Sequence, residues 1–189
     1  MTDDLKQAVV WKNLVIDGRE YCGVWHVSDG WLLKGTAVGV LKDQRPVQAK
    51  YEVYCDENWL THRVQVERTI GSDVKSLSLT VESRGAWRNS GLELPAVRGC
   101  DDVDLAFTPA TNTIAIRRLN LPVGASESTI AAWVNFPDLL IQPLSQRYTR
   151  LEKNRYRYES NTGFSAEITV DDFGMVISYP SGWERIAAL

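Results

Sequence analysis

Apolar and polar positions alternate along much of the chain. In "SLSLTVE" (76–82), Leu77, Leu79 and Val81 fall on one side and the polar residues on the other. In "GFSAEITVDDFGMVISYP" (163–180), the same alternation is interrupted by Asp-Asp-Phe-Gly. A period of two puts successive side chains on opposite faces of a strand. These segments therefore predict a strand and a β-hairpin with its turn at 171–174.

Similar runs recur at intervals of about 8–14 residues, a spacing typical of β-sandwiches and β-barrels. They are "EYCGVWHV", "WLLKGTAVGVL", "AKYEVYCDE", "WLTHRVQVERTI", "DVDLAFTP", "TIAIRRLNL", "AAWVNFP" and "NRYRYES". Helical periodicity is brief, at residues 2–9 and in "SESTIAAW". The sequence therefore predicts an all-β fold, a many-stranded and mostly antiparallel roll or barrel with little helix, as a single domain over residues 1–189.

Composition narrows the class of protein. Hydrophobic residues make up 44% of the 189 positions and charged residues 24%, as in an ordered globular protein. The net charge is −3 and the basic residues are scattered, which argues against a nucleic-acid partner. No apolar run approaches the roughly 20 residues of a transmembrane segment. The start, "MTDDLKQAVVWKNL", lacks the basic and then apolar pattern of a secretory signal. We therefore expect a cytoplasmic protein.

The cysteines do not form a recognisable framework. Cys22, Cys55 and Cys100 are odd in number and far apart, and no C-x-x-C spacing occurs. This pattern favours free thiols over disulfides or a metal site.

Aromatic residues are abundant, with seven Trp and seven Tyr. If residues 59–67 form one regular strand, Trp59 and Arg63 share a face with Thr61, Gln65 and Glu67. A face that is both aromatic and polar suits the lining of a ligand cavity, because Trp combines apolar area with a hydrogen-bonding tip. The alternative is that these aromatics only cover the rim of the core.

The stretch "CDDVDLAFTPATNTIAIRRL" (100–119) concentrates the polar chemistry. Its alternation predicts a hairpin in which Asp102 and Asp104 share one face and Arg117 and Arg118 lie on the following strand. The carboxylates could pair with the arginines and fix the register, or the group, with Asn112 of the turn, could bind a polar head group. Acid/base chemistry or a hard cation is a further option.

Motifs for other chemistry are absent from the sequence. There is no G-x-S-x-G and no phosphate-binding glycine loop, and His26 and His62 have no neighbouring Ser or Cys partner. No H-x-x-x-H or second D-x-D accompanies the two aspartates. We therefore assign no catalytic residues, no metal ligands and no cofactor.

Several segments together resemble a bacterial family, the putative glycolipid-binding proteins. They are "WLTHRVQVE", "DVDLAFTPATNTIAIRRL", "AWVNFPDL", "RYTRLEKNRYRYES" and "GFSAEITVDDFGMVISYPSGW". The resemblance covers nearly the whole chain. It implies an all-β roll or barrel similar to lipoprotein-carrier barrels, and a ligand-binding role. It supplies no catalytic residues.

The leading hypothesis is a non-catalytic protein that binds a glycolipid or another amphiphile in a barrel-like cavity. Because no export signal is visible, we expect this binding in the cytoplasm. The alternatives are an enzyme that acts on a sugar or lipid derivative through Asp102 and Asp104, and a protein-interaction module with an exposed sheet edge. The predicted ligand-binding residues are Trp59, Arg63, Asp102, Asp104, Asn112, Arg117, Arg118 and Trp133.

Overall fold

The computed structural model describes residues 4–82 and 85–189. Within these residues one 15-stranded sheet holds all the strands, in the order β8-β7-β6-β5-β4-β3-β2-β1-β15-β14-β13-β12-β11-β10-β9. Neighbouring strands are antiparallel except β9 and β10, which are parallel. The first half contains β1 (Asp4–Asn13), β2 (Gly18–Val27), β3 (Gly30–Val40), β4 (Pro46–Cys55), β5 (Thr61–Ile70), β6 (Asp73–Glu82), β7 (Ala86–Asn89) and β8 (Leu92–Glu93). The second half contains β9 (Asp102–Leu105), β10 (Ser126–Val134), β11 (Ile141–Glu152), β12 (Arg155–Ser160), β13 (Ser165–Val170), β14 (Val176–Tyr179) and β15 (Trp183–Ala188). The predicted all-β, mostly antiparallel class is confirmed.

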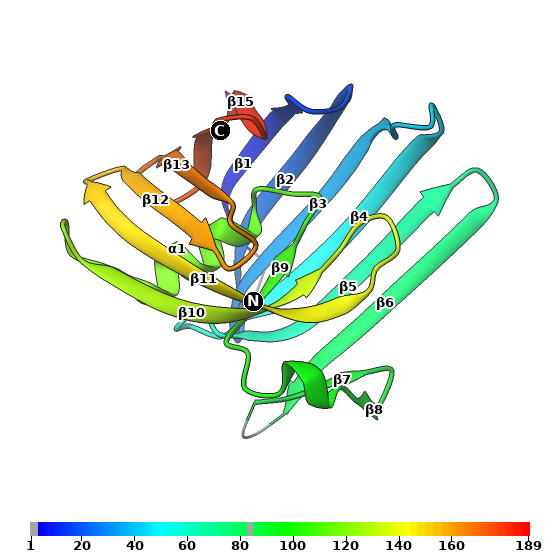
Figure 1. Ribbon diagram of the computed structural model, residues 1–189, viewed down its shortest axis with the longest axis horizontal. Coiled ribbons are helices and arrows are strands. Elements are labelled where there is room, and N and C mark those ends of the chain that lie inside the picture. The colour runs from blue at the N-terminus through cyan, green and yellow to red at the C-terminus, as the bar shows by residue number, and fades with distance from the viewer. Residues whose placement is uncertain (1–3, 83–84) are drawn as a thin grey trace.

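The sheet curls into a roll. β1 pairs with β15, which joins the two halves of the chain in one continuous sheet. Figure 1 shows β10–β13 curving round to face β1–β5, with β9 and the helix α1 (Thr111–Leu119) between them. The Val103 amide of β9 donates a hydrogen bond to the hydroxyl of Thr61 on β5 (3.4 Å), so the edge of one half approaches the other. The inner face of the roll is therefore enclosed.

The regular alternations predicted their strands correctly. "SLSLTVE" lies in β6, and residues 163–180 contain the hairpin of β13 and β14. In β6, Leu77 and Leu79 are buried and Ser76 is exposed. β6 and β13 each have one face toward the core and one toward solvent, so their period of two is visible in the sequence.

The hairpin predicted over 100–119 is wrong in its second half. Residues 102–105 form β9, but the segment that carries the arginine pair is α1, so Arg117 and Arg118 lie on a helix and not on a strand. Because α1 lies inside the roll, successive residues from Thr113 to Ile116 are all buried, which hides a helical period. The helix ends at Asn120, whose φ of 41° is the left-handed conformation that Asn adopts readily after a helix.

The shared face predicted for residues 59–67 is also wrong. The pairing of β4 with β5 shifts between Tyr54 and Cys55, because Tyr54 faces Arg63 and Cys55 faces Thr61. This β-bulge leaves His62 as an extra residue, which reverses the alternation after Thr61. Trp59 and Thr61 are buried, whereas Arg63 points to the solvent side.

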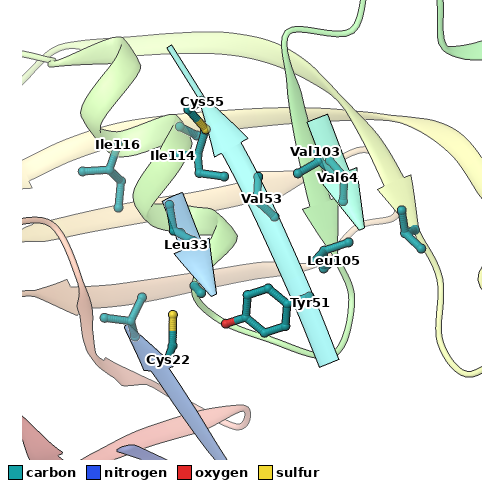
Figure 2. Close-up of a cluster of buried hydrophobic side chains, with 14 of the residues drawn as sticks. Cys22, Leu33, Tyr51, Val53, Cys55, Val64, Val103, Leu105, Ile114 and Ile116 are labelled. Atoms are coloured by element: carbon teal, nitrogen blue, oxygen red, sulfur yellow. The ribbon is translucent and has the colours of Figure 1, made fainter. Parts of the chain in front are cut away.

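The core lies between α1 and the inner face of the sheet. Figure 2 shows Ile114 and Ile116 of α1 beside Leu33, Tyr51 and Val53 of the strands, with Val103 and Leu105 of β9 close by. The free thiols of Cys22, Cys55 and Cys100 are buried. Within the described residues, no helix has the length and apolar character needed to cross a membrane.

Candidate functional site

Two cavities lie at opposite ends of α1. The larger, about 990 Å³, is bordered by the loops that follow β1, β3, β10 and β12 and reaches Asn112 near the start of the helix. The smaller, about 640 Å³, surrounds the end of the helix from Ile116 to Asn120. We call them the apolar cavity and the polar cavity. α1 separates them inside the roll.

Aromatic and aliphatic side chains form most of the wall of the apolar cavity. The aromatic ones are Phe107, Trp133, Phe136, Tyr158, Phe164, Tyr179 and Trp183, and the aliphatic ones include Val15, Ile16, Val38, Val47, Leu105 and Leu144. Three of these residues, Val15, Val38 and Phe164, are also exposed at the surface and mark the mouth. A largely apolar cavity of this volume is typical of small-molecule sites.

Polar groups lie together at the inner end of this cavity. Asp104 of β9 is the register partner of Trp133 on β10, and both line the cavity. Gln146 donates a hydrogen bond from Nε2 to Asp104 Oδ2 (2.5 Å). The Tyr148 hydroxyl donates to Asn112 Oδ1 (3.1 Å). This end of the cavity therefore offers a carboxyl and an amide beside an indole ring.

Burial inside the roll raises the pKa of Asp104 to about 6, and the hydrogen bond from Gln146 opposes this rise only in part. The native state therefore binds a proton more tightly than the unfolded chain, so stability falls as pH rises from about 4 to about 6. We expect Asp104→Asn to remove this loss, because the amide oxygen still accepts from Gln146 and carries no charge. The variant gains about 2–3 kcal/mol at pH 7 relative to wild type. Urea unfolding at pH 4 and pH 7 measures the difference.

Asp17→Asn is the matched control, because the Asp17 side chain is 92% exposed. Its unfolding free energy is expected to follow that of the wild type at both pH values. Equal pH dependence in Asp104→Asn and wild type would contradict the assignment.

A second buried carboxyl lies behind the wall of the apolar cavity. Glu20 of β2 is 1% exposed, and its Oε1 accepts hydrogen bonds from the hydroxyls of Tyr51 (2.5 Å) and Thr108 (2.6 Å). Thr108 itself lines the cavity. Gly35 has no side chain, and a Cβ there would overlap the Tyr51 ring. Burial raises the pKa of Glu20 to about 8, so this carboxyl is mostly uncharged at neutral pH.

An ion pair fixes α1 to β9 near the polar cavity. The Arg118 guanidinium donates from Nε to Asp102 Oδ1 (2.9 Å) and from Nη2 to Asp102 Oδ2 (2.6 Å), and also donates to the Thr129 hydroxyl (2.8 Å). Asp102 is 2% exposed. Burial raises the pKa of Asp102, while the hydrogen bonds and charge of Arg118 lower it. Asp102 therefore has a structural partner, one of the arrangements considered from the sequence.

Asp102 and Asp104 have different surroundings although they are two residues apart. Asp102 pairs with Arg118, and Asp104 faces the apolar cavity and Gln146. Among the described residues, no three His, Cys, Asp or Glu side chains gather as ligands of a metal would. The two carboxylates therefore have different partners and do not form one site.

The guanidinium of Arg117 lies over aromatic rings, 5.5 Å from the ring centroid of Trp59 and 5.1 Å from that of Phe173. Trp59 in turn stacks on Trp31, with 4.7 Å between ring centroids. Arg63 is elsewhere, 4.5 Å above the Tyr54 ring and on the wall of neither cavity. The eight predicted residues are thus divided between the apolar cavity (Asp104, Asn112, Trp133), the polar cavity (Trp59, Arg117, Arg118), the buried ion pair (Asp102) and the outer surface (Arg63).

Sequence reasoning missed several polar residues that line the two cavities or lie directly behind their walls. They are Glu20, Tyr51, Thr108, Gln146, Tyr148 and Arg150. Only Glu20 could have been found from the sequence. It shares a strand face with Gly18, Cys22 and Val24, and a single acidic residue on a face of small and apolar residues indicates a buried carboxyl. The partner of Gln146, Asp104, is distant in sequence, as is one partner of Arg150, Leu121, so no local pattern identifies these contacts.

Comparisons with known proteins agree with this architecture. The chain is similar, at 30% identity over 89% of its length and 92% of the other chain, to the crystal structure of a DUF1089 family protein (PA1994) from Pseudomonas aeruginosa, with a TM-score of 0.81. It also shares its fold with a β-barrel-like protein of the domain of unknown function DUF1849 from Brucella abortus (TM-score 0.57, 8% identity, 96% of each chain). The comparison with curated proteins found no match. The family model described as putative glycolipid-binding matches residues 8–185, and the chain belongs to this family.

Proposed function

We propose that the protein binds an amphiphile, with a glycolipid as the best-fitting class, in the apolar cavity. The observation that carries the proposal is a largely apolar cavity wall with polar side chains gathered at the end where Trp133 lies. Trp133, Asp104 and Asn112 lie at that end. An indole face packs against the C–H face of a sugar ring, and a carboxyl and an amide bond its hydroxyls. The family assignment supports a binding role of this kind.

The aromatic wall suits the apolar part of the ligand. The rings of Phe107 and Phe136 are 4.9 Å apart between centroids, and those of Phe164 and Tyr179 are 6.1 Å apart. The second pair lies toward the mouth, because Phe164 is 44% exposed. An acyl chain packed against these rings removes apolar surface of both partners from water, which stabilises the complex by roughly 25 cal/mol per Å².

A cavity-filling variant tests the proposal. Ala37 of β3 lines the apolar cavity, so Ala37→Phe places a ring in the space of the ligand. We expect at least a roughly tenfold loss of affinity for a fluorescent fatty acid and for a short-chain alkyl glucoside, because the filled volume is no longer available to either. Displacement titrations on delipidated protein measure both affinities.

The matched control is Thr36→Phe, the adjacent residue on the opposite face of the same strand. It is expected to bind both probes as wild type does. A further variant, Trp133→Leu, separates the two parts of the ligand, since it should weaken the alkyl glucoside more than the fatty acid. Absence of saturable binding of either probe, or equal loss in Ala37→Phe and Thr36→Phe, would contradict the proposal.

A further inference from the structure

The polar cavity at the end of α1 has a chemistry of its own. Four cationic side chains and three acidic ones line it, together with three aromatic rings. The cations are Arg117, Arg118, Arg150 and Lys153, the acids are Glu57, Asp171 and Asp172, and the rings are those of Trp59, Tyr156 and Phe173. The residues that line it are more highly charged than those of the apolar cavity, so it is suited to a different ligand.

Most of these charges have a partner within the described residues. Arg118 is held by Asp102, as described above. Lys153 pairs with Asp172 (2.9 Å). Asp171 pairs with Arg185, a residue outside the cavity wall, and also accepts backbone amides of its own turn. Glu57 contacts the imidazole of His26 (3.1 Å). Two arginines, Arg117 and Arg150, have no carboxylate partner among residues 4–82 and 85–189.

Arg117 lies on two aromatic rings near the end of α1, where it is exposed to solvent. Its guanidinium lies over the rings of Trp59 and Phe173, and its stem packs near Gly174, where a Cβ would be 3.4 Å from Cδ of Arg117. No described residue accepts a hydrogen bond from it. Stacking on ring faces leaves the in-plane N–H groups of a guanidinium available, and these fit the two oxygens of a carboxylate or phosphate.

The turn that contains Trp59 fixes the position of its indole under Arg117. Trp59 has a φ of 67°, a left-handed conformation that is uncommon for a bulky residue. The Asp56 carboxylate stabilises this turn by accepting the amides of Asn58 (2.9 Å) and Leu60 (2.9 Å). The indole under the guanidinium is therefore fixed before any ligand arrives, which lowers the entropy cost of binding.

Arg150 adds positive charge to the same space. Its guanidinium donates to the backbone carbonyls of Leu121 (2.7 Å) and Lys153 (2.6 Å) and lies 5.5 Å from the ring centroid of Tyr156. Burial raises the pKa of Tyr156, and the positive charges of Arg150 and Arg117 oppose this rise. Both charges therefore act at the Tyr156 hydroxyl, for which no described residue is a hydrogen-bond partner.

We propose that the polar cavity binds a small oxyanion, a phosphate or carboxylate group, on the in-plane N–H groups of Arg117, with the charge of Arg150 and the hydroxyl of Tyr156 completing the site. α1 and its buried residues separate this site from the apolar cavity. The proposal therefore stands whether or not an amphiphile binds there. Arg117 would bind the anion, and Trp59 and Phe173 would position Arg117.

Calorimetric titration with inorganic phosphate and with acetate tests the site. Wild type is expected to bind at least one of the two saturably, with a Kd of about 1 mM or tighter and weaker binding at high salt. Arg117→Gln should lose at least roughly tenfold in affinity. The affinity of Arg117→Lys should lie between those of wild type and Arg117→Gln, because lysine keeps the charge without the planar fork. Arg147→Gln is the matched control, since Arg147 is an exposed arginine on β11 that lines neither cavity.

The source of the anion is distinguished by vesicles. Phosphatidylcholine vesicles with and without phosphatidic acid are compared for wild type and Arg117→Gln. Binding that requires both phosphatidic acid and Arg117 assigns the site to a lipid head group, whereas phosphate binding without vesicle binding assigns it to a free anion. The proposal is overturned by wild-type protein that binds both phosphate and acetate more weakly than a Kd of about 1 mM, or by equal losses in Arg117→Gln and Arg147→Gln.

Discussion

Replacing Glu20 with glutamine is expected to abolish most of the loss of stability that the wild-type protein shows between about pH 6 and pH 8. Burial raises the pKa of Glu20 from 4.5 to about 8. Between these values the native state holds a proton that the unfolded chain has released, so the free energy of unfolding falls as pH rises through this window. Full ionisation costs on the order of 5 kcal/mol, from 1.36 kcal/mol per pKa unit.

Glutamine keeps the geometry that surrounds Glu20. Its amide oxygen accepts from Tyr51 and Thr108 as Oε1 of the carboxyl does, and it does not ionise. Urea unfolding at pH 5, 7 and 9, analysed with a common m-value, gives the profile of each protein. The Asp104 window ends near pH 6, so the change above that pH belongs to Glu20.

Glu67→Gln is the control for this experiment, because Glu67 is an exposed carboxylate on β5. Its profile should run parallel to that of the wild type. If wild type and Glu20→Gln lose equal stability between pH 6 and pH 9, the buried carboxyl does not titrate as described.

The strands were predictable because a sheet with one buried and one solvated face requires apolar and polar residues to alternate along each strand. β6 and β13 show this pattern clearly. α1 was not predictable from periodicity, because a helix inside a roll is covered on most sides. Ile114, Ala115 and Ile116 are all buried in succession, and the two β-branched isoleucines favour a strand when the segment is considered by itself.

The candidate site was predicted residue by residue but not as an arrangement. Asp104 and Trp133 meet because β9 pairs in parallel with β10, a contact between segments joined through α1 that no local pattern encodes. Trp59 and Arg63 separate because of one bulge at His62. Arg117 and Arg118 point in different directions because adjacent residues of a helix are about 100° apart. The predicted strand would instead have placed the arginine pair opposite the two aspartates.

Replacing Arg118 with methionine is expected to destabilise the protein by about 3–5 kcal/mol at pH 7, because it leaves the buried carboxylate of Asp102 without its bidentate partner. Without Arg118 the pKa of Asp102 rises further, since only burial and the neighbouring Asp101 act on it strongly. Protonation then removes the unpaired charge, so the destabilisation should be smaller at pH 5 than at pH 7. Chemical unfolding at the two pH values measures this difference.

The double variant Arg118→Met with Asp102→Asn should recover much of the loss, because the pair is replaced by uncharged groups. Arg157→Met is the control, as its pair with Glu167 is almost half exposed on both sides and contributes at most about 1 kcal/mol. A loss of similar size in both arginine variants would show that the pair with Asp102 contributes no more to stability than an exposed pair does.

Arg118 also fixes the helix that separates the cavities and carries Asn112 at one end and Arg117 at the other. Arg118 does not line the apolar cavity, so weaker ligand binding there in folded Arg118→Met would identify the ion pair as a contact that positions this site.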